Sequence, residues 1–212
     1  VRKLNEVITK RFIKFLVKQA EDSPGDYRQF YERFNRFLKE GIVASPAHQE
    51  LLAGLLRFES SMTDSGEVTS LDGYLDRMKE GQEEVYFLVG PSREVLEKGP
   101  YFDGFRDRGL EVAFFTEAVD DYVLEGLREY KGKKLVAANR SGIELEDLPQ
   151  EGGEDSLNEE ETEGLISWLN SALEGRVAQV DAGKRLVNHP MVALLPEDAP
   201  NAQMRAMMEA MG

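Results

Sequence analysis

Cysteine is absent from the 212 residues of this chain. Its absence excludes disulfides, cysteine-ligated zinc, iron–sulfur clusters and thiol nucleophiles, and it fits a reducing compartment. Only two histidines are present, His48 and His189, and they lie far apart without a neighbouring HExxH pattern. Isolated histidines of this kind are usually ordinary surface or core residues, so we predict no metal site.

The chain also lacks an apolar run long enough to cross a bilayer, so we expect a soluble protein with no membrane partner. Its first residues are charged and helix-patterned, unlike a signal peptide. Acidic residues outnumber basic ones, 40 to 26, and the formal net charge is -14. This balance argues against nucleic acid as the main partner, because neutralising phosphates needs clustered Lys and Arg.

Motifs of common active sites are missing as well. The sequence has no GxxxxGK[ST] or GxGxxG loop and no GxSxG elbow. Gly90-Pro91-Ser92 lies between a predicted strand and a predicted helix, where backbone amides can hold an anion, but a plain helix cap is the simpler interpretation. The acidic pair Asp120-Asp121 fits the dipole at a helix start better than acid–base chemistry. We assign no catalytic residue.

What the sequence does contain begins with helices. Apolar residues at three- and four-residue steps form one stripe on the first helix, which we expect to start upstream of this chain. A second helix is predicted over residues 26–40 and ended by Gly41, and a third over 46–58 with Ser45 as its cap. Together they predict a helical bundle within residues 1–80.

Beyond residue 80 short apolar runs alternate with helical patterns. Buried strands are predicted at Val85–Val89, Glu111–Thr116 and Lys134–Ala138, with a helix over 119–130 before the last of them. Strands and helices that alternate through short connections predict a parallel sheet flanked by helices. The predicted fold class is therefore α/β, a helical bundle joined to a small parallel α/β/α layer over 81–143.

An acidic segment follows, with ten acids and no Lys or Arg between Glu144 and Glu163. This composition predicts a solvated acidic linker over residues 144–159. Residues 160–212 predict part of a second α+β domain that looks truncated, since about fifty residues make a poor core alone. It should hold a helix to Leu173 with Trp168 facing inward, strands over 177–187 and 191–195, and a short terminal helix.

The terminal helix is rich in methionine. Met204, Met207, Met208 and Met211 recur at steps that place them on one helical face. Such a face is either core or a deformable binding surface, because methionine is flexible and polarizable. The residues alone leave both interpretations open.

Several blocks, in this order and spacing, resemble the middle domain of the 90 kDa heat shock protein family. They are Leu55–Ser61, Thr69–Gln82, Lys98–Tyr101, Gly109–Val112, Val119–Tyr122 and Glu129–Lys133. The variant Glu59-Ser60-Ser61 and the segment Glu159–Trp168 look closest to the mitochondrial paralogue and to related bacterial chaperones. The resemblance covers nearly the whole chain and is weakest in the acidic segment.

This resemblance implies part of an ATP-dependent chaperone that binds and remodels non-native client proteins. Residues 1–143 would be the later part of the middle domain, and residues 160–212 the start of the C-terminal domain. ATP and Mg²⁺ would bind elsewhere in the full-length protein, which would be a homodimer, and this chain would hold no cofactor. The protein would be cytoplasmic if bacterial, or lie in the mitochondrial matrix if it is the paralogue.

The resemblance also implies where clients bind, on the helix after the second strand and on an amphipathic helix of the C-terminal domain. The candidate client-binding residues are Asp121, Tyr122, Glu125, Trp168, Met204, Met207 and Met208. Bacterial members often carry Trp at the position of Tyr122, which keeps an aromatic ring with a polar tip.

Two other hypotheses stand beside the chaperone. One is a small α/β enzyme with a site at the carboxyl ends of the strands, near Gly90 and Thr116, where open parallel sheets place their ligands. The other is a structural scaffold whose Met-rich face is buried.

Overall fold

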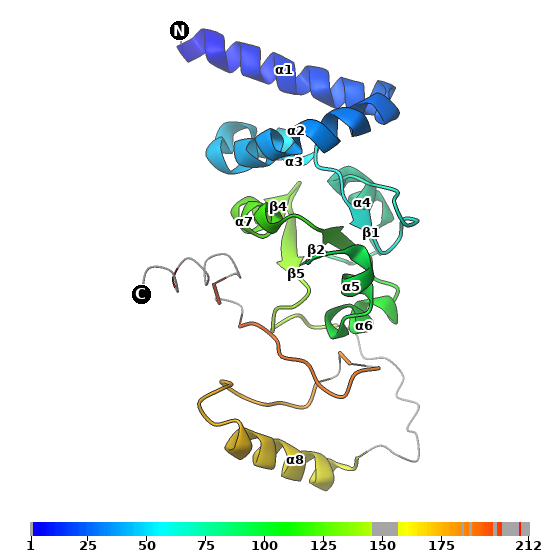
Figure 1. Ribbon diagram of the computed structural model, residues 1–212, viewed down its shortest axis with the longest axis vertical. Coiled ribbons are helices and arrows are strands. Elements are labelled where there is room, and N and C mark those ends of the chain that lie inside the picture. Colours follow the sequence, from blue (N-terminus) through cyan, green and yellow to red (C-terminus); the bar gives the residue numbers. More distant parts are fainter. Residues whose placement is uncertain are drawn as a thin grey trace.

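A computed structural model describes the chain over residues 2–145, 157–183, 185–186, 188–196, 199–200 and 208. Figure 1 shows helices α1 to α3 at one end, a mixed sheet with its covering helices in the middle, and helix α8 at the other end. Within the described ranges, no helix combines the length and apolar character needed to cross a membrane.

The helical part begins with two long helices, α1 (Arg2–Asp22) and α2 (Pro24–Ala44), separated by Ser23. Pro24 occupies the first turn of α2, where its missing N–H costs no hydrogen bond. The prediction that Gly41 ends this helix is wrong, because α2 continues to Ala44.

The predicted third helix is also shorter than expected. A 3-10 turn at Pro46–His48 leads into the five-residue helix α3 (Gln49–Ala53), and the Ser45 side chain makes no capping hydrogen bond. The chain then leaves the helical part as an irregular segment, and this segment carries Arg57 towards the sheet.

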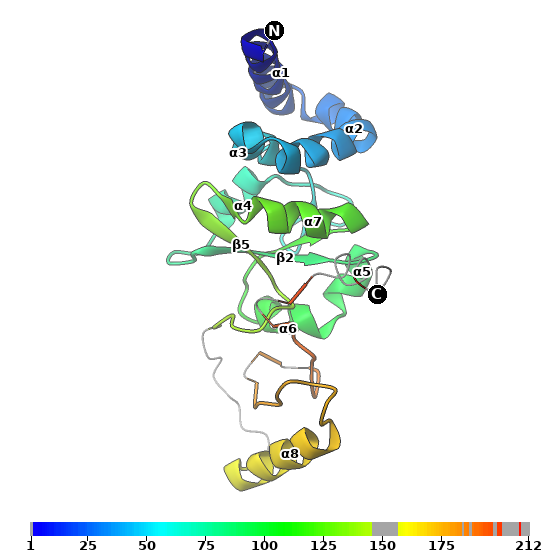
Figure 2. The ribbon, with the colours of Figure 1, turned by 90° about the vertical axis from the view of Figure 1, so that its left-hand side faces the viewer.

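Only part of the apolar surface of α1 is covered. Ile13 and Leu16 are buried against α2, whereas five other apolar residues remain at least half exposed among the described residues. These five are Leu4, Val7, Ile8, Phe12 and Phe15. The helical bundle is therefore open, because α1 extends away from α3 and the sheet (Figures 1 and 2).

The sheet has the strand order β1-β3-β2-β5-β4. Its strands are β1 (Glu59–Ser60), β2 (Glu84–Val89), β3 (Val112–Phe115), β4 (Glu129–Tyr130) and β5 (Lys133–Ala137). The three predicted strands β2, β3 and β5 are parallel, as expected. The two edge strands are antiparallel and were not predicted, because each is two residues long and has no periodicity to detect.

Four helices connect or cover the strands: α4 (Leu71–Arg77), α5 (Arg93–Glu97), α6 (Pro100–Arg106) and α7 (Ala118–Leu127). Ser70 and Ser92 cap α4 and α5 by accepting hydrogen bonds from backbone N–H groups. Helix α7 ends before the predicted residue 130, since Arg128 adopts a left-handed conformation with φ of 57° and starts the β4–β5 hairpin.

Both faces of the sheet are buried, which explains why its strands are continuous apolar runs. Phe87 and Phe115 point into a core shared with α2, α3, α4 and α7. Their neighbours Tyr86, Leu88 and Phe114 point to the other face, against α6. Figure 2 shows α7 above the sheet and α6 below it.

The second unit is only partly formed. Helix α8 (Glu159–Ala172) is present, with a capping box between Asn158 and Glu161, but none of its residues is buried. The inward placement of Trp168 is therefore wrong, since its side chain is 64% exposed. The predicted strands over 177–187 and 191–195 are absent from the residues described there, and one bridge joins Leu195 to Arg140.

A short stretch of this unit is held against α6 and the end of β5. Arg185 donates hydrogen bonds to the carbonyls of Ala138 and Arg140, at 2.5 and 2.7 Å, and its guanidinium lies over the Phe105 ring. The His189 ring contacts the buried carboxylate of Asp103 at 2.5 Å. Most of the predicted acidic linker, residues 146–156, lies outside the described residues, and the domain division stays a prediction.

Helix α2 is joined to α7 by a buried ion pair, which generates the first testable prediction. Lys39 Nζ lies 2.6 Å from Asp120 Oδ1, and the two side chains are 3% and 4% exposed. Replacing Lys39 with Met should lower the free energy of unfolding by about 3–5 kcal/mol, because it leaves a buried carboxylate without its cation. Urea unfolding at neutral pH measures this change.

The matched control is Arg36→Met on the same helix, where the Arg36–Glu40 pair is solvent-exposed and should contribute below about 0.5 kcal/mol. Burial raises the pKa of Asp120 and Lys39 lowers it, so removing Lys39 favours the protonated carboxyl in the folded state. The destabilisation should therefore shrink as the pH falls through the folded-state pKa of Asp120. Equal effects of the two variants would contradict the role of the pair.

Candidate functional site

Helix α7 presents two different sides. Val123, Leu124 and Leu127 are buried against the core of the sheet. Asp121, Tyr122 and Glu125 lie on the other side, and the Tyr122 side chain is 49% exposed.

An open groove of about 780 Å³ runs between α7, β5 and the segment around Pro200, and we call it the α7–β5 groove. Its larger apolar residues are Phe87, Leu124, Leu135, Val136, Ile143, Pro200 and Met208. Its acidic residues are Glu84, Asp121, Glu125 and Glu129, and its basic residues are Arg128, Lys134 and Arg140. The groove is thus an apolar channel with a charged margin in which acids are the majority.

The structure brings together three of the predicted client-binding residues. Asp121, Glu125 and Met208 all line the α7–β5 groove, although Met208 is distant in sequence from the other two. Met208 is 63% exposed, so the hypothesis of a buried Met face does not hold at this residue.

The other predicted client-binding residues do not line the groove or lie outside the described residues. Tyr122 is exposed on α7 beside the groove but does not line it. Trp168 lies on α8, at the far end of the molecule (Figure 1), and is not brought to the groove. Met204 and Met207 lie outside the described residues.

Arg140 organises the groove and was missed from the sequence. Its Nη2 donates to Glu125 Oε1 at 2.9 Å, while its Nη1 donates to the carbonyls of Pro196 and Ala199 at 2.8 and 2.6 Å. The same guanidinium therefore joins α7 to the segment that closes one wall. One signal was available, since a cation follows the third parallel strand, where the carboxyl ends of such strands place ligands.

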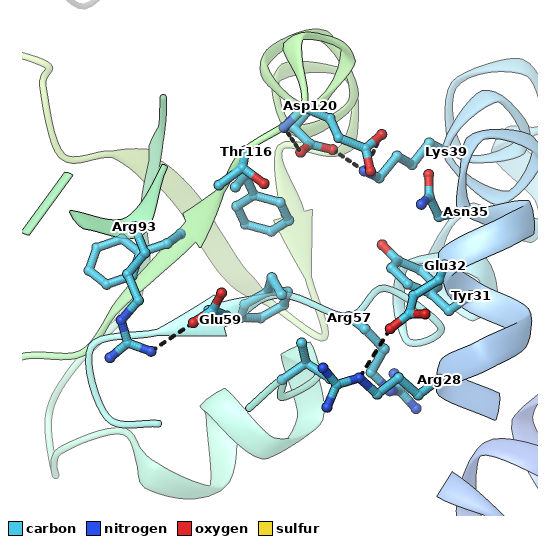
Figure 3. Close-up of a pocket in the computed structure, with 15 residues that line it drawn as sticks. Arg28, Tyr31, Glu32, Asn35, Lys39, Arg57, Glu59, Arg93, Thr116 and Asp120 are labelled. Atoms are coloured by element: carbon cyan, nitrogen blue, oxygen red, sulfur yellow. Dashed lines mark hydrogen bonds and ion pairs between the residues drawn. The ribbon is translucent and has the colours of Figure 1, made fainter. Parts of the chain in front are cut away.

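A second cavity, of about 230 Å³, lies between α2 and the sheet (Figure 3). Thr116 lines it, but Gly90 does not, and Gly90 packs instead against the Leu96 side chain. Its acidic residues are ion-pair partners: Glu32 of Arg28, Glu59 of Arg93, and Glu117 and Asp120 of Lys39. Carboxylates held this way are poor candidates for general bases, so the geometry gives the enzyme hypothesis no support. Within the described ranges, no group of three His, Asp or Glu could hold a metal ion.

Comparison with known proteins places the chain in a family. The family model described as Hsp90 protein matches residues 1–212. The chain belongs to the 90 kDa heat shock protein family. The resemblance found in the sequence is thereby confirmed over its whole length.

Relatives of this chain include bacterial proteins named Chaperone protein HtpG. That of Desulfitobacterium hafniense is 42% identical over 195 residues, covering 92% of this chain and 32% of its own length. Those of Desulfotalea psychrophila and Shewanella denitrificans are 36% and 37% identical, covering 99% and 97% of this chain and 34% and 33% of their own. The chain spans about a third of the length of these relatives, and they fit the bacterial type.

The contacts of Arg140 generate a prediction about the groove. Arg140→Ala removes the ion pair with Glu125 and the hydrogen bonds to Pro196 and Ala199, so the contact between Leu195 and the end of β5 should open more often. We expect faster amide hydrogen exchange at Leu195 and Ser141, whose N–H groups bond to the carbonyls of Asn139 and Leu195.

Lys134→Ala is the control for this experiment, because Lys134 lines the same groove and no hydrogen bond of its side chain to the segment is seen among the described residues. It should leave the exchange of Leu195 and Ser141 unchanged. Equal exchange in the Arg140→Ala variant and the unaltered chain would show that the guanidinium does not hold this wall.

Proposed function

We propose that this chain is part of an ATP-dependent molecular chaperone that binds and remodels non-native proteins, and that the α7–β5 groove contacts the client. The observation that carries this proposal is the meeting of Asp121 and Glu125 with Met208 around one open apolar channel. The names of the relatives, Chaperone protein HtpG, support the same activity.

The chemistry of the groove suits a partner without fixed structure. Non-native proteins expose apolar side chains that a folded protein buries, and covering them is favourable because it removes apolar surface from water. Met208 can adapt to many shapes, since its thioether chain is flexible and polarizable. The acidic majority at the margin favours clients with basic residues and opposes association between copies of this acidic chain.

We propose that ATP and Mg²⁺ bind in the full-length protein, and we expect their site to lie outside this chain. This expectation rests on the family and on the absence of a GxxxxGK[ST] or GxGxxG loop from the sequence. From the family we also propose that the full-length protein is a homodimer. We propose a cytoplasmic location for it, with the mitochondrial matrix as the alternative. ATP-driven closure of that dimer would change the geometry around the groove.

Client binding can be tested by fluorescence anisotropy with labelled, carboxymethylated α-lactalbumin, which stays unfolded. Met208→Ser and Tyr122→Ser remove exposed apolar surface at and beside the groove. Each should weaken binding roughly fivefold, the equivalent of about 1 kcal/mol for partial burial of one side chain. The far-ultraviolet spectrum should not change, because both side chains are exposed.

Met62→Ser is the matched control, since Met62 is 50% exposed and lies outside the groove, and it should bind the client normally. Trp168→Ser tests the remaining predicted contact, with a similar loss expected if α8 also touches the client. Unaltered affinity in both Met208→Ser and Tyr122→Ser would refute the groove as the binding surface.

A further inference from the structure

The smaller cavity contains polar groups that take no part in the proposed client binding. It lies between α2, the segment from Arg57 to the start of β1, the end of β3 and the start of α7 (Figure 3). Helix α7 separates it from the α7–β5 groove, because Asp120 lines the cavity while Asp121 and Leu124 line the groove. The two sites are therefore distinct.

Tyr31 supplies a buried donor without an acceptor. Its side chain is 7% exposed, and its hydroxyl has no hydrogen-bond partner in the described structure. Figure 3 shows the hydroxyl pointing into the cavity. Tyr27, one turn earlier on α2, donates instead to the carbonyl of Leu55 at 2.7 Å. Burial raises the pKa of Tyr31 well above its usual range, so the hydroxyl keeps its proton at neutral pH.

Arg57 supplies a desolvated cation with unused donors. Its Nη1 donates to the carbonyls of Gly54 and Leu56, at 3.1 and 2.8 Å, and its guanidinium lies 4.7 Å from the centre of the Tyr27 ring. These contacts fix the plane of the guanidinium. Its Nε and Nη2 groups donate to no residue in the described ranges, which leaves part of its hydrogen-bonding capacity for another molecule.

The remaining cations of the cavity are already neutralised. Their ion pairs join Arg28 to Glu32, Arg93 to Glu59 and Lys39 to Asp120, with N···O distances of 3.3, 3.0 and 2.6 Å. Arg57 has no such carboxylate among the described residues. A partly buried guanidinium with unused N–H groups and a buried hydroxyl donor without an acceptor are costly unless an acceptor reaches them.

We propose that this cavity binds a small anion whose carboxylate or phosphate oxygens accept hydrogen bonds from the Tyr31 hydroxyl and the Arg57 guanidinium. Asn35, which also lines the cavity, can hydrogen-bond a hydroxyl or a second acidic group of the ligand. The volume, about 230 Å³, is below the about 300–1,000 Å³ of sites for drug-sized molecules, so the ligand is a compact acid or inorganic phosphate. This inference does not rest on chaperone activity.

The experiment uses the 212-residue chain with two probes, inorganic phosphate and citrate, each compared with sodium chloride at the same ionic strength. Isothermal titration should show saturable binding, and the unfolding temperature should rise with probe concentration, because a ligand that binds the folded state stabilises it. The net charge of -14 disfavours unspecific anion uptake, so saturation reports a specific site.

Tyr31→Phe is the decisive variant. It deletes a hydroxyl that has no partner, so the ligand-free protein should be as stable as the unaltered chain, while affinity for the probe falls roughly tenfold. Arg57→Gln should weaken binding further, and circular dichroism checks that this variant remains folded. Tyr101→Phe is the matched control, since that hydroxyl donates to Ala193 outside the cavity and its loss should leave affinity unchanged.

Saturable binding of phosphate alone identifies a phosphate site, and binding of citrate alone identifies a carboxylate site. Both results support the proposal when Tyr31→Phe weakens them. Absence of saturable binding for both probes would overturn it, as would equal affinity of the Tyr31→Phe variant and the unaltered chain.

Discussion

The ion pair between Lys39 and Asp120 holds α2 against α7, and so holds the helical part against the α/β layer. One carboxylate serves both parts of the molecule, because Asp120 Oδ1 receives the Lys39 ammonium while its Oδ2 accepts the Glu117 N–H at the start of α7. The start of α7 is therefore fixed by the same group that binds α2. Two charges buried together tolerate little displacement, since any gap leaves each of them without water and without a partner.

Helix α7, held in this way, is the wall between two sites of opposite character. On one side lies a wide, open groove with a flexible methionine and a charged margin, which suits clients that share no common shape. On the other side lies a small cavity with fixed ion pairs, a buried hydroxyl and a rigidly stacked guanidinium, which suits one compact ligand. A ligand in the cavity would lie in the same space that Lys39 and Asp120 line. Helix α7 thus forms a wall of both the groove and the cavity, although the side chains that line the two sites differ in kind.

Local chemistry made much of the fold predictable. The parallel strands β2, β3 and β5 followed from short apolar runs, and Ser70 and Ser92 marked their helix starts by capping. The predictions were wrong where the sequence pattern was short, or where the environment of a residue depended on contacts with distant elements. Gly41 lies inside α2 because the contacts of Leu38 and Ile42 with the core continue that helix past it. Trp168 lies on an amphipathic helix that buries none of its residues, so its periodicity did not give its environment.

The sequence by itself determined the family, the α/β class and the candidate residues on α7, because blocks of residues and hydrophobic periodicity are properties of the chain. Only the tertiary structure decided that Met208 meets Asp121 and Glu125, that Arg140 joins α7 to the segment before Pro200, and that Tyr31 and Arg57 face one cavity. These groups come from elements far apart in the chain, and their meeting depends on how the helices pack over the sheet. Contacts between such distant residues produce no periodicity in the sequence, because each residue belongs to a different helix, strand or loop.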